Sequence, residues 1–294
     1  MILVAANPYS GAADNRRRVD ALARELAALG ESSRVVWDAR ERAATLADRA
    51  VMARCRAVVA AGGDGTVAQV INELAPGTPF AAFPAGTENL FAAAFGFADD
   101  AGALARALAT GRMRPLDLGR ATAPGRSRLF ALMLSAGLDA DVVRRLAEWR
   151  AVGTTLRRVR RTSYVAPLAR ALGRYRYPPV RVTAGNTAAT GVGCVVANVP
   201  AYALGLALAP AARADDGALD WVVFERAGVI AVATYAWAVW RGRHLARVDV
   251  CAGRATRLTL DAAAAVPVQL DGDPWGTTPV EVEVVPGALT LIAT

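Results

Sequence analysis

The stretch Ala57-Val58-Val59-Ala60-Ala61, followed by Gly62-Gly63-Asp64-Gly65-Thr66, decides how the first part of the chain folds. The apolar run predicts a buried strand, and residues from Thr66 to Leu74 have the spacing of a helix. Glycines at such a junction let the backbone turn sharply and approach a phosphate, while the helix N-terminus offers unpaired N–H groups. Asp64 would repel a phosphate unless a cation lay between them, which suggests magnesium or a ribose hydroxyl. A simple helix cap is the structural alternative for Asp64.

Short apolar strands alternate with helices on both sides of this junction. The predicted strands are Ile2–Ala6, Arg34–Trp37, Ala57–Ala61 and Pro79–Phe83. The predicted helices are Val19–Leu29, Ala43–Ala53, Thr66–Leu74, Asn89–Phe97 and Asp100–Leu108. This alternation is typical of a parallel sheet covered by helices. We therefore expect residues 1–118 to form an α/β nucleotide-binding domain with a parallel sheet.

Two further turns follow strands of the same predicted sheet. Pro84-Ala85-Gly86-Thr87-Glu88-Asn89 repeats the strand–glycine–helix pattern, and Thr87 and Asn89 can donate hydrogen bonds to a phosphate or a base. Asn7 and Ser10-Gly11 follow the first strand, where an ordinary turn is the equal alternative. The carboxyl ends of parallel strands meet at one edge of a sheet, which is where nucleotides bind in open α/β folds. The two glycine loops together therefore indicate a nucleotide site.

Beyond residue 118, strand-like stretches separated by turn residues dominate the chain. They are Phe130–Leu134, Val180–Thr183, Gly193–Val199, Leu219–Phe224, Thr256–Leu260, Val266–Leu270, Val280–Val285 and Ala288–Ile292. Two helical insertions interrupt them, at Asp139–Leu172 and Gly228–Val239. The pattern predicts a mostly antiparallel β-sandwich as a second domain, residues 119–294.

Composition excludes several kinds of chemistry. The 34 cationic residues are all arginine, so neither a Schiff-base lysine nor a P-loop lysine is available. His244 is the one histidine, which argues against a Ser-His-Asp triad or a multi-histidine zinc site. The N-terminus lacks the features of a signal peptide, and the longest apolar run, from Ala227 to Trp240, is shorter than the roughly 18–20 residues of a spanning helix. We expect a cytoplasmic protein with at most peripheral membrane contact.

Two acids near the C-terminus, Asp271 and Asp273, flank Gly272 at the end of an alternating strand. A kinase needs a carboxylate to position or deprotonate the attacking hydroxyl, and acids linked to the metal that accompanies ATP. Asp-Gly is also a common hairpin turn, and for this short segment alone the turn is the favoured interpretation.

Taken together, these motifs resemble the lipid kinase family that includes bacterial diacylglycerol kinases and the sphingosine and ceramide kinases. The resemblance covers nearly the whole chain. It depends on the order and spacing of Asn7-Pro8-Tyr9-Ser10-Gly11, Gly62 to Thr66, Gly86-Thr87-Glu88-Asn89, Asp117, Gly137, Ala209-Pro210 through Asp215-Asp216-Gly217, and Asp271-Gly272-Asp273.

The resemblance implies ATP-dependent phosphorylation of a lipid hydroxyl, with ATP in the cleft between an α/β domain and a β-sandwich. It assigns the nucleotide to the turns that follow the first-domain strands: Asn7, Gly62, Gly63, Asp64, Gly65, Thr66, Gly86, Thr87 and Asn89. Asp64 and Asp117 would join a magnesium–water network, and Asp273 would be the catalytic base with Asp271 beside it. Asp216, with the main-chain carbonyls of Arg213 and Ala218, would hold a separate structural magnesium, since carboxylate and carbonyl oxygens suit this cation.

The chain departs from the family pattern at three positions. The family usually has glutamate where Asp273 stands, aspartate where Leu90 stands and often glutamate where Gln69 stands. Two alternatives therefore stay open: a kinase like NAD kinase, which also uses a Gly-Gly-Asp-Gly loop, and a non-catalytic lipid- or nucleotide-binding relative. The identity of the lipid, whether diacylglycerol, a sphingoid base or another, does not follow from the sequence.

Positive charge is concentrated between Arg144 and Arg181, where eleven arginines face a single acid, Glu148. Within this segment arginines alternate with apolar and aromatic residues at Leu156, Arg157, Arg158, Val159, Arg160, Arg161, Tyr164 and Val165. Trp237 and Trp240 precede Arg241 and Arg243 in the other insertion. We expect these segments to contact an anionic membrane at the inner face. No base-reading motif supports nucleic acid as a partner, and a homodimer stays open.

Overall fold

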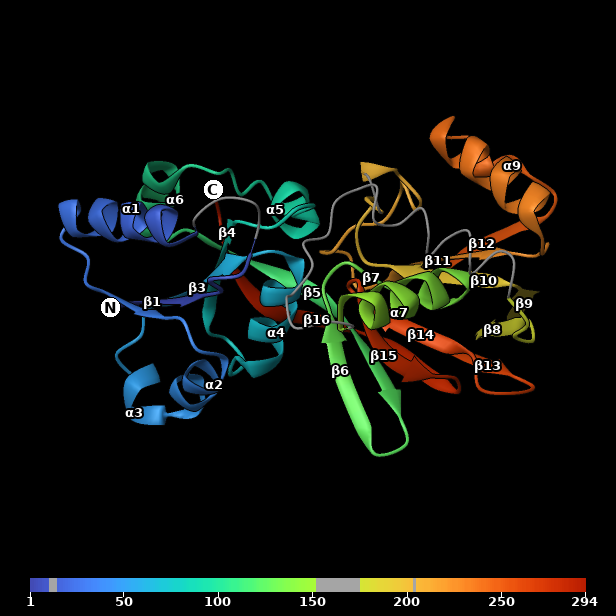
Figure 1. The fold of residues 1–294 in the computed structure, drawn as a ribbon, viewed down its shortest axis with the longest axis horizontal. Helices are drawn as coiled ribbons and strands as arrows, with labels where there is room; N and C mark the ends of the chain where they lie inside the picture. Colours follow the sequence, from blue (N-terminus) through green and yellow to red (C-terminus); the bar gives the residue numbers. More distant parts are fainter. Residues whose placement is uncertain (11–14, 152–174, 203–204) are drawn as a thin grey trace. The chain divides into compact units, whose positions relative to one another are not determined.

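The computed structural model describes residues 1–10, 15–151, 175–202 and 205–294 (Figure 1). Contacts divide the chain into two compact units. The first unit comprises Met1–Asp117 and Pro286–Thr294, and the second comprises Leu118–Val285.

The first unit is an α/β layer structure. Its strands are β1 (Ile2–Ala6), β2 (Ser33–Val36), β3 (Ala57–Gly62), β4 (Pro79–Pro84) and the final part of β16 (Val280–Ile292). Its helices are α1 (Asn15–Ala28), α2 (Ala39–Ala47), α3 (Arg49–Met52), α4 (Asp64–Glu73), α5 (Leu90–Phe95) and α6 (Ala101–Thr110). The strands lie in the order β2-β1-β3-β4-β16, and each neighbouring pair is parallel. The predicted parallel sheet is confirmed.

Helices cover both faces of this sheet, with α1 and α6 on one face and α2 and α3 on the other (Figure 1). Because both faces are covered, β1 and β3 are buried along their whole length, which explains their uninterrupted apolar sequences. The prediction of a single helix at Ala43–Ala53 is wrong, because two helices, α2 and α3, occupy this region. The carboxylate of Asp48 accepts hydrogen bonds from the N–H groups of Ala50 and Val51, ends α2 and begins α3.

The second unit is a sandwich of antiparallel strands. They are β5 (Met113–Ala123), β6 (Arg126–Phe130), β7 (Met133–Gly137), β8 (Val180–Ala184), β9 (Thr187–Gly191), β10 (Gly193–Ala197), β11 (Leu219–Phe224), β12 (Val250–Ala255), β13 (Arg257–Ala262), β14 (Pro267–Leu270), β15 (Asp273–Thr277) and the first part of β16. One sheet has the order β12-β11-β10-β7-β14-β15, and the other contains β16-β13-β8-β9 together with β5 and β6. The predicted sandwich is confirmed.

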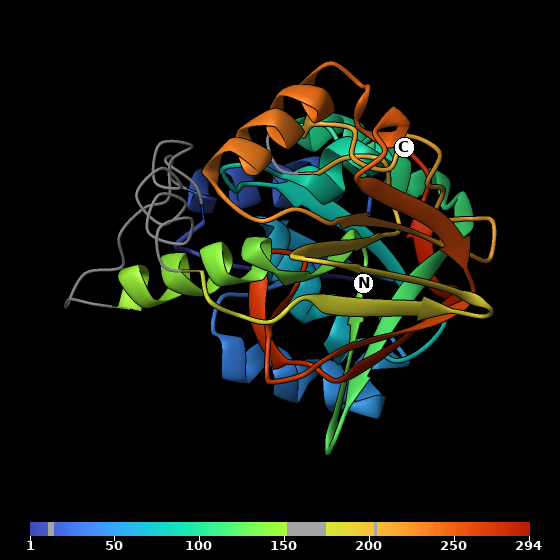
Figure 2. The ribbon, with the colours of Figure 1, turned by 90° about the vertical axis from the view of Figure 1, so that its right-hand side faces the viewer.

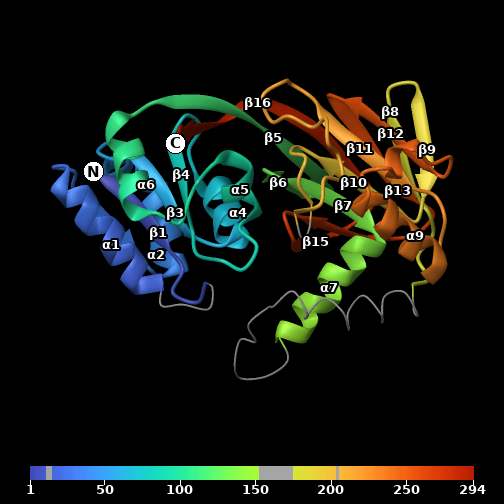
Figure 3. The ribbon, with the colours of Figure 1, turned by 90° about the horizontal axis from the view of Figure 1, so that it is seen from above.

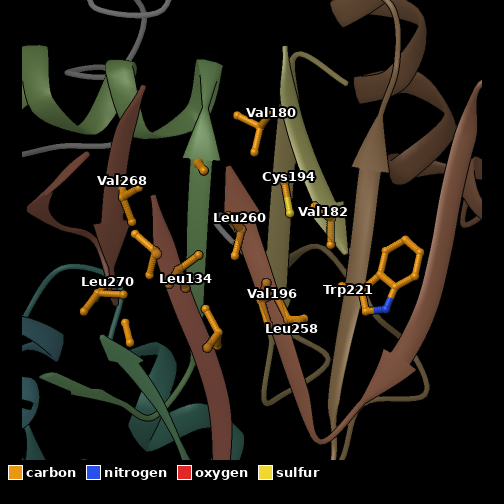
Figure 4. Close-up of a cluster of buried hydrophobic side chains, with 14 of the residues drawn as sticks. Leu134, Val180, Val182, Cys194, Val196, Trp221, Leu258, Leu260, Val268 and Leu270 are labelled. Carbon is orange, nitrogen blue, oxygen red and sulfur yellow. The ribbon is translucent and has the colours of Figure 1, made fainter. Parts of the chain in front are cut away.

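Both sheets contribute to one apolar core (Figure 4). Leu134, Val196 and Trp221 enter it from the first sheet, while Val182 and Leu258 enter it from the other. All five side chains are buried, and buried positions alternate with exposed ones along β8 and β13, because one face of these strands packs inward.

Sequence patterns misplaced several strands of the second unit. The strand expected at Phe130–Leu134 is instead the junction of β6 and β7, where the chain passes from one sheet of the sandwich to the other. The two strands expected at Val280–Val285 and Ala288–Ile292 form the single strand β16. Residues 286–294, expected in the second domain, belong to the first unit because the end of β16 pairs with β4, with Thr290 opposite Pro79 and Leu291 opposite Phe80.

Two helices accompany the sandwich. Helix α7 (Leu138–Ala151) begins directly after β7 (Figure 3), and α9 (Val229–Trp240) is followed by the short helix η3 (His244–Ala246). These helices match the two predicted insertions, although most of the first insertion lies outside the described residues. Within the described ranges, no helix combines the length and apolar character needed to cross a bilayer.

Candidate active site

Three turns meet at one edge of the first unit's sheet. Asn7 follows β1, Gly63 follows β3, and Gly86 follows β4. The strand register aligns Ala6 with Ala61 and Gly62 with Pro84, so the three turns leave the sheet at the same edge. The structure therefore brings together the residues that the sequence assigned to the nucleotide.

The two glycine loops touch through their backbones. A Cβ atom on Gly86 would lie 2.5 Å from the Cα of Gly63, and one on Gly62 would lie 2.4 Å from Oγ1 of Thr66. A hydrogen bond of 2.9 Å from the N–H of Ala85 to the carbonyl of Gly62 also joins the loops. Close packing therefore requires glycine at Gly62 and Gly86, and the paired loops form one unit.

Asparagine side chains hold the first turn against the glycine loop. The amide of Asn7 donates to Oγ1 of Thr66 at 3.3 Å and accepts from the N–H of Tyr9 at 2.9 Å. Asn15, which is buried, donates to the carbonyls of Asn7 and Ala61 at 2.7 and 3.1 Å. Sequence reasoning missed Asn15, because an asparagine at the start of a helix reads as an ordinary polar residue.

Asp64 performs the capping role that the sequence left as an alternative, but for a different helix. Its two carboxylate oxygens accept hydrogen bonds from the N–H groups of Leu90 and Phe91, at 3.1 and 2.9 Å, in the first turn of α5. Burial raises the pKa of Asp64, and the N–H groups of Phe91 and Leu90 partly oppose this shift. The carboxylate is thereby fixed between the two loops.

Asn89 closes the second glycine loop on itself. It lies in the left-handed region with φ of 53°, and its side chain accepts from the N–H of Gly86 at 2.7 Å and donates to the carbonyl of Gly86 at 3.0 Å. The side chain of Thr87 is exposed. Asn89 therefore shapes the loop, whereas Thr87 is the residue of this loop that faces solvent.

Asp117 lies in β5 and is buried. Its carboxylate accepts a hydrogen bond of 2.8 Å from the N–H of Gly287, where β16 enters the first unit. The structure thus gives this expected metal-linked acid a backbone partner within the first unit.

Asp271 occupies a hairpin turn between β14 and β15. Asp271 and Gly272 have φ of 49° and 84°, as a two-residue hairpin turn requires. The buried Asp271 carboxylate accepts three backbone hydrogen bonds from Ala131, Leu132 and Met133, at 2.8, 2.8 and 3.0 Å. Burial raises its pKa to about 6, and the three N–H donors oppose the shift. Asp271 thus anchors the β6–β7 connection.

Asp273 has a different environment, although it is only two residues away. Its side chain is 37% exposed and forms an ion pair with Arg128, with an Nη2–Oδ2 distance of 3.0 Å. One oxygen of this carboxylate therefore remains available to a ligand. Of the two acids assigned to catalysis in this turn, Asp273 has the accessibility that the role demands.

A polar network connects the Asp271–Asp273 turn to α7. Gln269 accepts from the N–H of Gly272 at 2.7 Å and donates to Oγ of Ser135 at 2.9 Å and to Oδ2 of Asp139 at 3.3 Å. Asp139 also accepts from Ser135 and from the hydroxyl of Tyr202. Sequence reasoning missed this network, because its members are far apart in the chain.

Asp139 and Tyr202 also form the polar end of an otherwise apolar cavity in the second unit. The cavity has a volume of about 210 Å³ and lies between α9 and the strands β10 and β11. Its apolar lining includes Leu138, Leu206, Leu208, Phe224, Val232 and Val239. An apolar cavity with few polar groups at one end suits a ligand with a hydrocarbon chain and a polar head.

The expected structural magnesium site has its acid already engaged. One oxygen of Asp216 accepts from the N–H of Ala218 at 3.2 Å, and the other forms an ion pair with Arg254. Arg254 also lies 3.7 Å from Asp220, its cross-strand neighbour. The side chain of Arg213 pairs with Asp215 at 3.1 Å. A magnesium ion bound by Asp216 would therefore have to displace the guanidinium of Arg254, which repels a second cation.

Several predicted residues lie outside the described ranges. They are Gly11 of the first turn and the residues of the basic insertion, Leu156, Arg157, Arg158, Val159, Arg160, Arg161, Tyr164 and Val165. Sequence reasoning also missed Arg18, which donates to the carbonyl of Pro84 at the end of β4 and pairs with Asp99. No local pattern distinguishes Arg18 from the other arginines of α1.

Two family models together match most of the chain. Residues 1–121 match the diacylglycerol kinase catalytic domain, and residues 133–293 match the YegS C-terminal NAD kinase beta sandwich-like domain. A protein of Pseudomonas aeruginosa strain PAO1, named "Probable lipid kinase YegS-like", is 31% identical over 261 residues, which cover 87% of this chain and 82% of that protein. The protein of the same name from strain UCBPP-PA14 matches equally well.

Two solved structures from Bacillus anthracis strain Sterne share the fold. One has a TM-score of 0.76 at 22% identity and covers 100% of this chain and 97% of its own. The other, a diacylglycerol kinase by its description, has a TM-score of 0.70 at 18% identity and covers 100% and 96%. The similarity extends through both units of the chain.

Proposed function

Because this chain belongs to the YegS-like, diacylglycerol kinase-type family of lipid kinases, we propose that it transfers the γ-phosphate of ATP to a hydroxyl group of a membrane lipid. The observation that carries the lipid part of this proposal is the apolar cavity beneath α9, whose polar end is formed by Asp139 and Tyr202. Inorganic or nucleotide acceptors have no use for such a lining, so the cavity favours a lipid over the acceptor of an NAD kinase.

The glycine loops of the first unit support the assignment of ATP. Since the chain contains no lysine, the phosphate contacts fall to backbone N–H groups, arginine and hydroxyl or amide side chains. Glycine at Gly62 and Gly86 lets the two loops pack closely, and the helix α4 begins directly after Gly63 of the first loop, so its N-terminal N–H groups are the ones that we assign to phosphate oxygens. Thr87 is the side chain of these loops that we assign to direct contact with ATP.

Magnesium, bound with ATP, would neutralise charge on the transferring phosphoryl group. Asp64 is the acid that we assign to this partner, because its carboxylate is fixed at the first turn of α5 beside the glycine loops and carboxylate oxygen is a preferred magnesium ligand. We assign Asp117 a structural role, in which its carboxylate accepts a hydrogen bond from the N–H of Gly287 in β16. We assign Asp216 a structural role, the ion pair with Arg254.

Asp273 is the proposed base. It accepts the proton of the lipid hydroxyl as that oxygen bonds to the γ-phosphorus, and the bond from phosphorus to the bridging oxygen breaks to release ADP. Arg128 holds one oxygen of Asp273 and leaves the other for the hydroxyl. Gln269 holds the turn through Gly272 and contacts Asp139 at the polar end of the cavity, so the cavity and the base share one hydrogen-bonded support.

Incubation with ATP labelled at the γ-position and a total lipid extract tests the proposal. The wild type should label a lipid in a magnesium-dependent reaction, and identification of the product names the acceptor. Asp273→Asn should bind ATP normally but transfer no label, whereas Asp261→Asn, an exposed acid of the same unit, should behave as wild type. Asp273→Glu should retain transfer, because glutamate keeps the carboxylate with one added methylene.

Three outcomes contradict the proposal in different ways. Label that stays in ATP or inorganic phosphate with every lipid would leave a nucleotide-binding protein without lipid kinase activity. Labelling of a soluble nucleotide in place of a lipid would select the NAD kinase-like alternative. Equal transfer by Asp273→Asn and wild type would reject Asp273 as the base.

A further inference from the structure

Helix α9 presents apolar side chains on both of its sides. Tyr235, Ala238 and Val239 are buried against the sandwich, where Tyr235 packs against Phe224 with ring centroids 4.9 Å apart. This inner side also lines the apolar cavity. The opposite side exposes Val229, Ile230, Trp237 and Trp240, at 59, 82, 62 and 61%. These four residues are named the outer face of α9, the helix whose orange ribbon lies near the top of Figure 2.

Apolar exposure is concentrated in this region of the described chain. Of nine large apolar side chains that are exposed there, six lie between residues 229 and 248: the outer face of α9 together with Leu245 and Val248. Scattered exposed apolar residues are normal, but a contiguous group on one helix and its following loop marks an interaction surface.

The outer face offers a partner few polar groups to hydrogen-bond. Thr234, the one hydroxyl-bearing residue on this side of α9, donates to the carbonyl of Ala231 at 2.8 Å within the helix. The rings of Trp237 and Trp240 lie 5.0 Å apart. A partner that covers this surface needs hydrocarbon and an interface for the indole groups, and needs no complementary hydrogen bonds.

Charge restricts the partner further. No acid occurs between residues 227 and 248, while Arg241 and Arg243 follow the tryptophans and are exposed. The guanidinium of Arg241 lies 6.0 Å from the ring centroid of Trp237. Arg247, by contrast, is committed to Asp249 at 2.8 Å. Hydrocarbon, aromatic rings and two available cations side by side match an anionic lipid surface.

We propose that the outer face of α9, with Arg241 and Arg243, docks on an anionic lipid bilayer and lies in its interface. The helix has 12 residues and so spans about 18 Å, well short of the roughly 30 Å of a hydrocarbon core. This inference rests on the proposed function, because docking would bring a lipid substrate to the protein. One side of α9 lines the apolar cavity, and the other side would contact the membrane.

Vesicle co-sedimentation of the full chain tests the docking surface. The vesicles are phosphatidylcholine alone or phosphatidylcholine with phosphatidylglycerol. Wild type should bind the anionic vesicles, and salt should weaken binding. Arg241→Gln with Arg243→Gln should lower the partition coefficient about 30-fold, from ~1 kcal/mol for each arginine near the surface. The matched control is Arg24→Gln with Arg54→Gln, two exposed arginines of the first unit, which should bind as wild type.

Insertion of the helix has its own test. Trp237→Ser with Trp240→Ser should lower partitioning at least tenfold, while Leu29→Ser with Met113→Ser, exposed apolar residues of the first unit, should not. Vesicles of brominated lipid should quench the tryptophan fluorescence of wild type. Trp237→Phe with Trp240→Phe should remove most of that quenching while keeping the binding.

The results separate docking from catalysis. Anionic-vesicle binding that needs the outer face, without any lipid phosphorylation, would uphold docking and defeat the kinase proposal. Phosphorylation of a short-chain lipid dissolved as monomer, by wild type and the tryptophan variant alike, would uphold the kinase whatever the vesicle result. Equal binding to neutral vesicles, no effect of the α9 variants, or a dimer that the tryptophan variant dissociates would overturn the docking proposal.

Discussion

Replacing Asp271 by asparagine should destabilise the protein far more than the same change at Asp273. The two acids are separated by one glycine in a single turn, and both were assigned to catalysis from the sequence. In the structure, Asp271 accepts three buried backbone hydrogen bonds, whereas Asp273 has one ion pair and a partly exposed side chain. The substitution removes the charge at each site and changes little in volume.

The magnitude follows from counting hydrogen-bond groups. Leu132 and Met133 donate to one oxygen of Asp271, and Ala131 donates to the other. An asparagine can keep one oxygen for two of these donors, but its NH₂ group then faces the remaining N–H. Leaving a buried N–H donor without a hydrogen-bond acceptor costs about 1–3 kcal/mol, and the remaining hydrogen bonds are weaker because their acceptor is no longer charged. We therefore expect Asp271→Asn to lower the free energy of unfolding by about 2–4 kcal/mol.

For Asp273→Asn the loss is one partly exposed ion pair with Arg128, which contributes about 0–1 kcal/mol to stability. Urea unfolding of wild type and both variants measures the two free energies of unfolding, and the lipid transfer assay measures activity. We expect Asp271→Asn to be unstable but catalytically competent at low temperature, and Asp273→Asn to be stable and inactive.

One combination of results would refute this reasoning. If Asp271→Asn unfolds at the same urea concentration as wild type and has lost transfer, the carboxylate of Asp271 acts in the reaction and does not anchor the β6–β7 connection. Circular dichroism of each variant before the assays confirms that the folded state is being measured.

Three further predictions concern pH, the glycine loops and magnesium. Burial raises the pKa of Asp271 to about 6, so the stability this group contributes is present at low pH and lost as the pH rises through about 6. The difference in unfolding free energy between wild type and Asp271→Asn should therefore be roughly 1 kcal/mol larger at pH 5 than at pH 7 by paired urea titrations; the reverse order would show that the three N–H donors outweigh burial and lower this pKa. Gly86→Ala should weaken ATP binding and cost about 1–3 kcal/mol, because its Cβ would lie 2.5 Å from the facing loop, while Gly102→Ala in α6 should be neutral or stabilising. Added magnesium should leave the Tm of wild type without nucleotide unchanged, because Arg254 already pairs with Asp216; a rise that Asp216→Ala abolishes would restore the structural metal.

The sequence predicted well that the glycine turns meet at the carboxyl edge of the first unit's sheet, because the signals for these turns are local. The apolar run before Gly62 is a buried strand in the structure, and the glycine turns after β3 and β4 meet as expected. Each of these features depends on residues within a few positions of one another. The alternation of residues in strands, the residue types of turns and the spacing of apolar residues in helices were therefore sufficient to predict the fold class of both units.

The roles of individual acids could not be predicted, because their partners are distant in sequence. Asp271 binds N–H groups about 140 residues away, and Asp64 caps a helix 26 residues further on. Arg254 reaches Asp216 only because β12 pairs with β11, which places Arg254 opposite Asp220. Such contacts depend on strand register, and no pattern in a single sequence gives the register of two distant strands.

The strand β16 makes the order of synthesis matter for the first unit. Residues 1–117 leave the ribosome first, yet their sheet receives its last parallel strand only from residues 286–294, after the whole second unit has been made. Until then β4 has an unpaired edge, the condition in which sheets recruit other chains. A deletion or a bulky fusion at residues 286–294 would thus damage the first unit, although these residues follow the sandwich in the sequence.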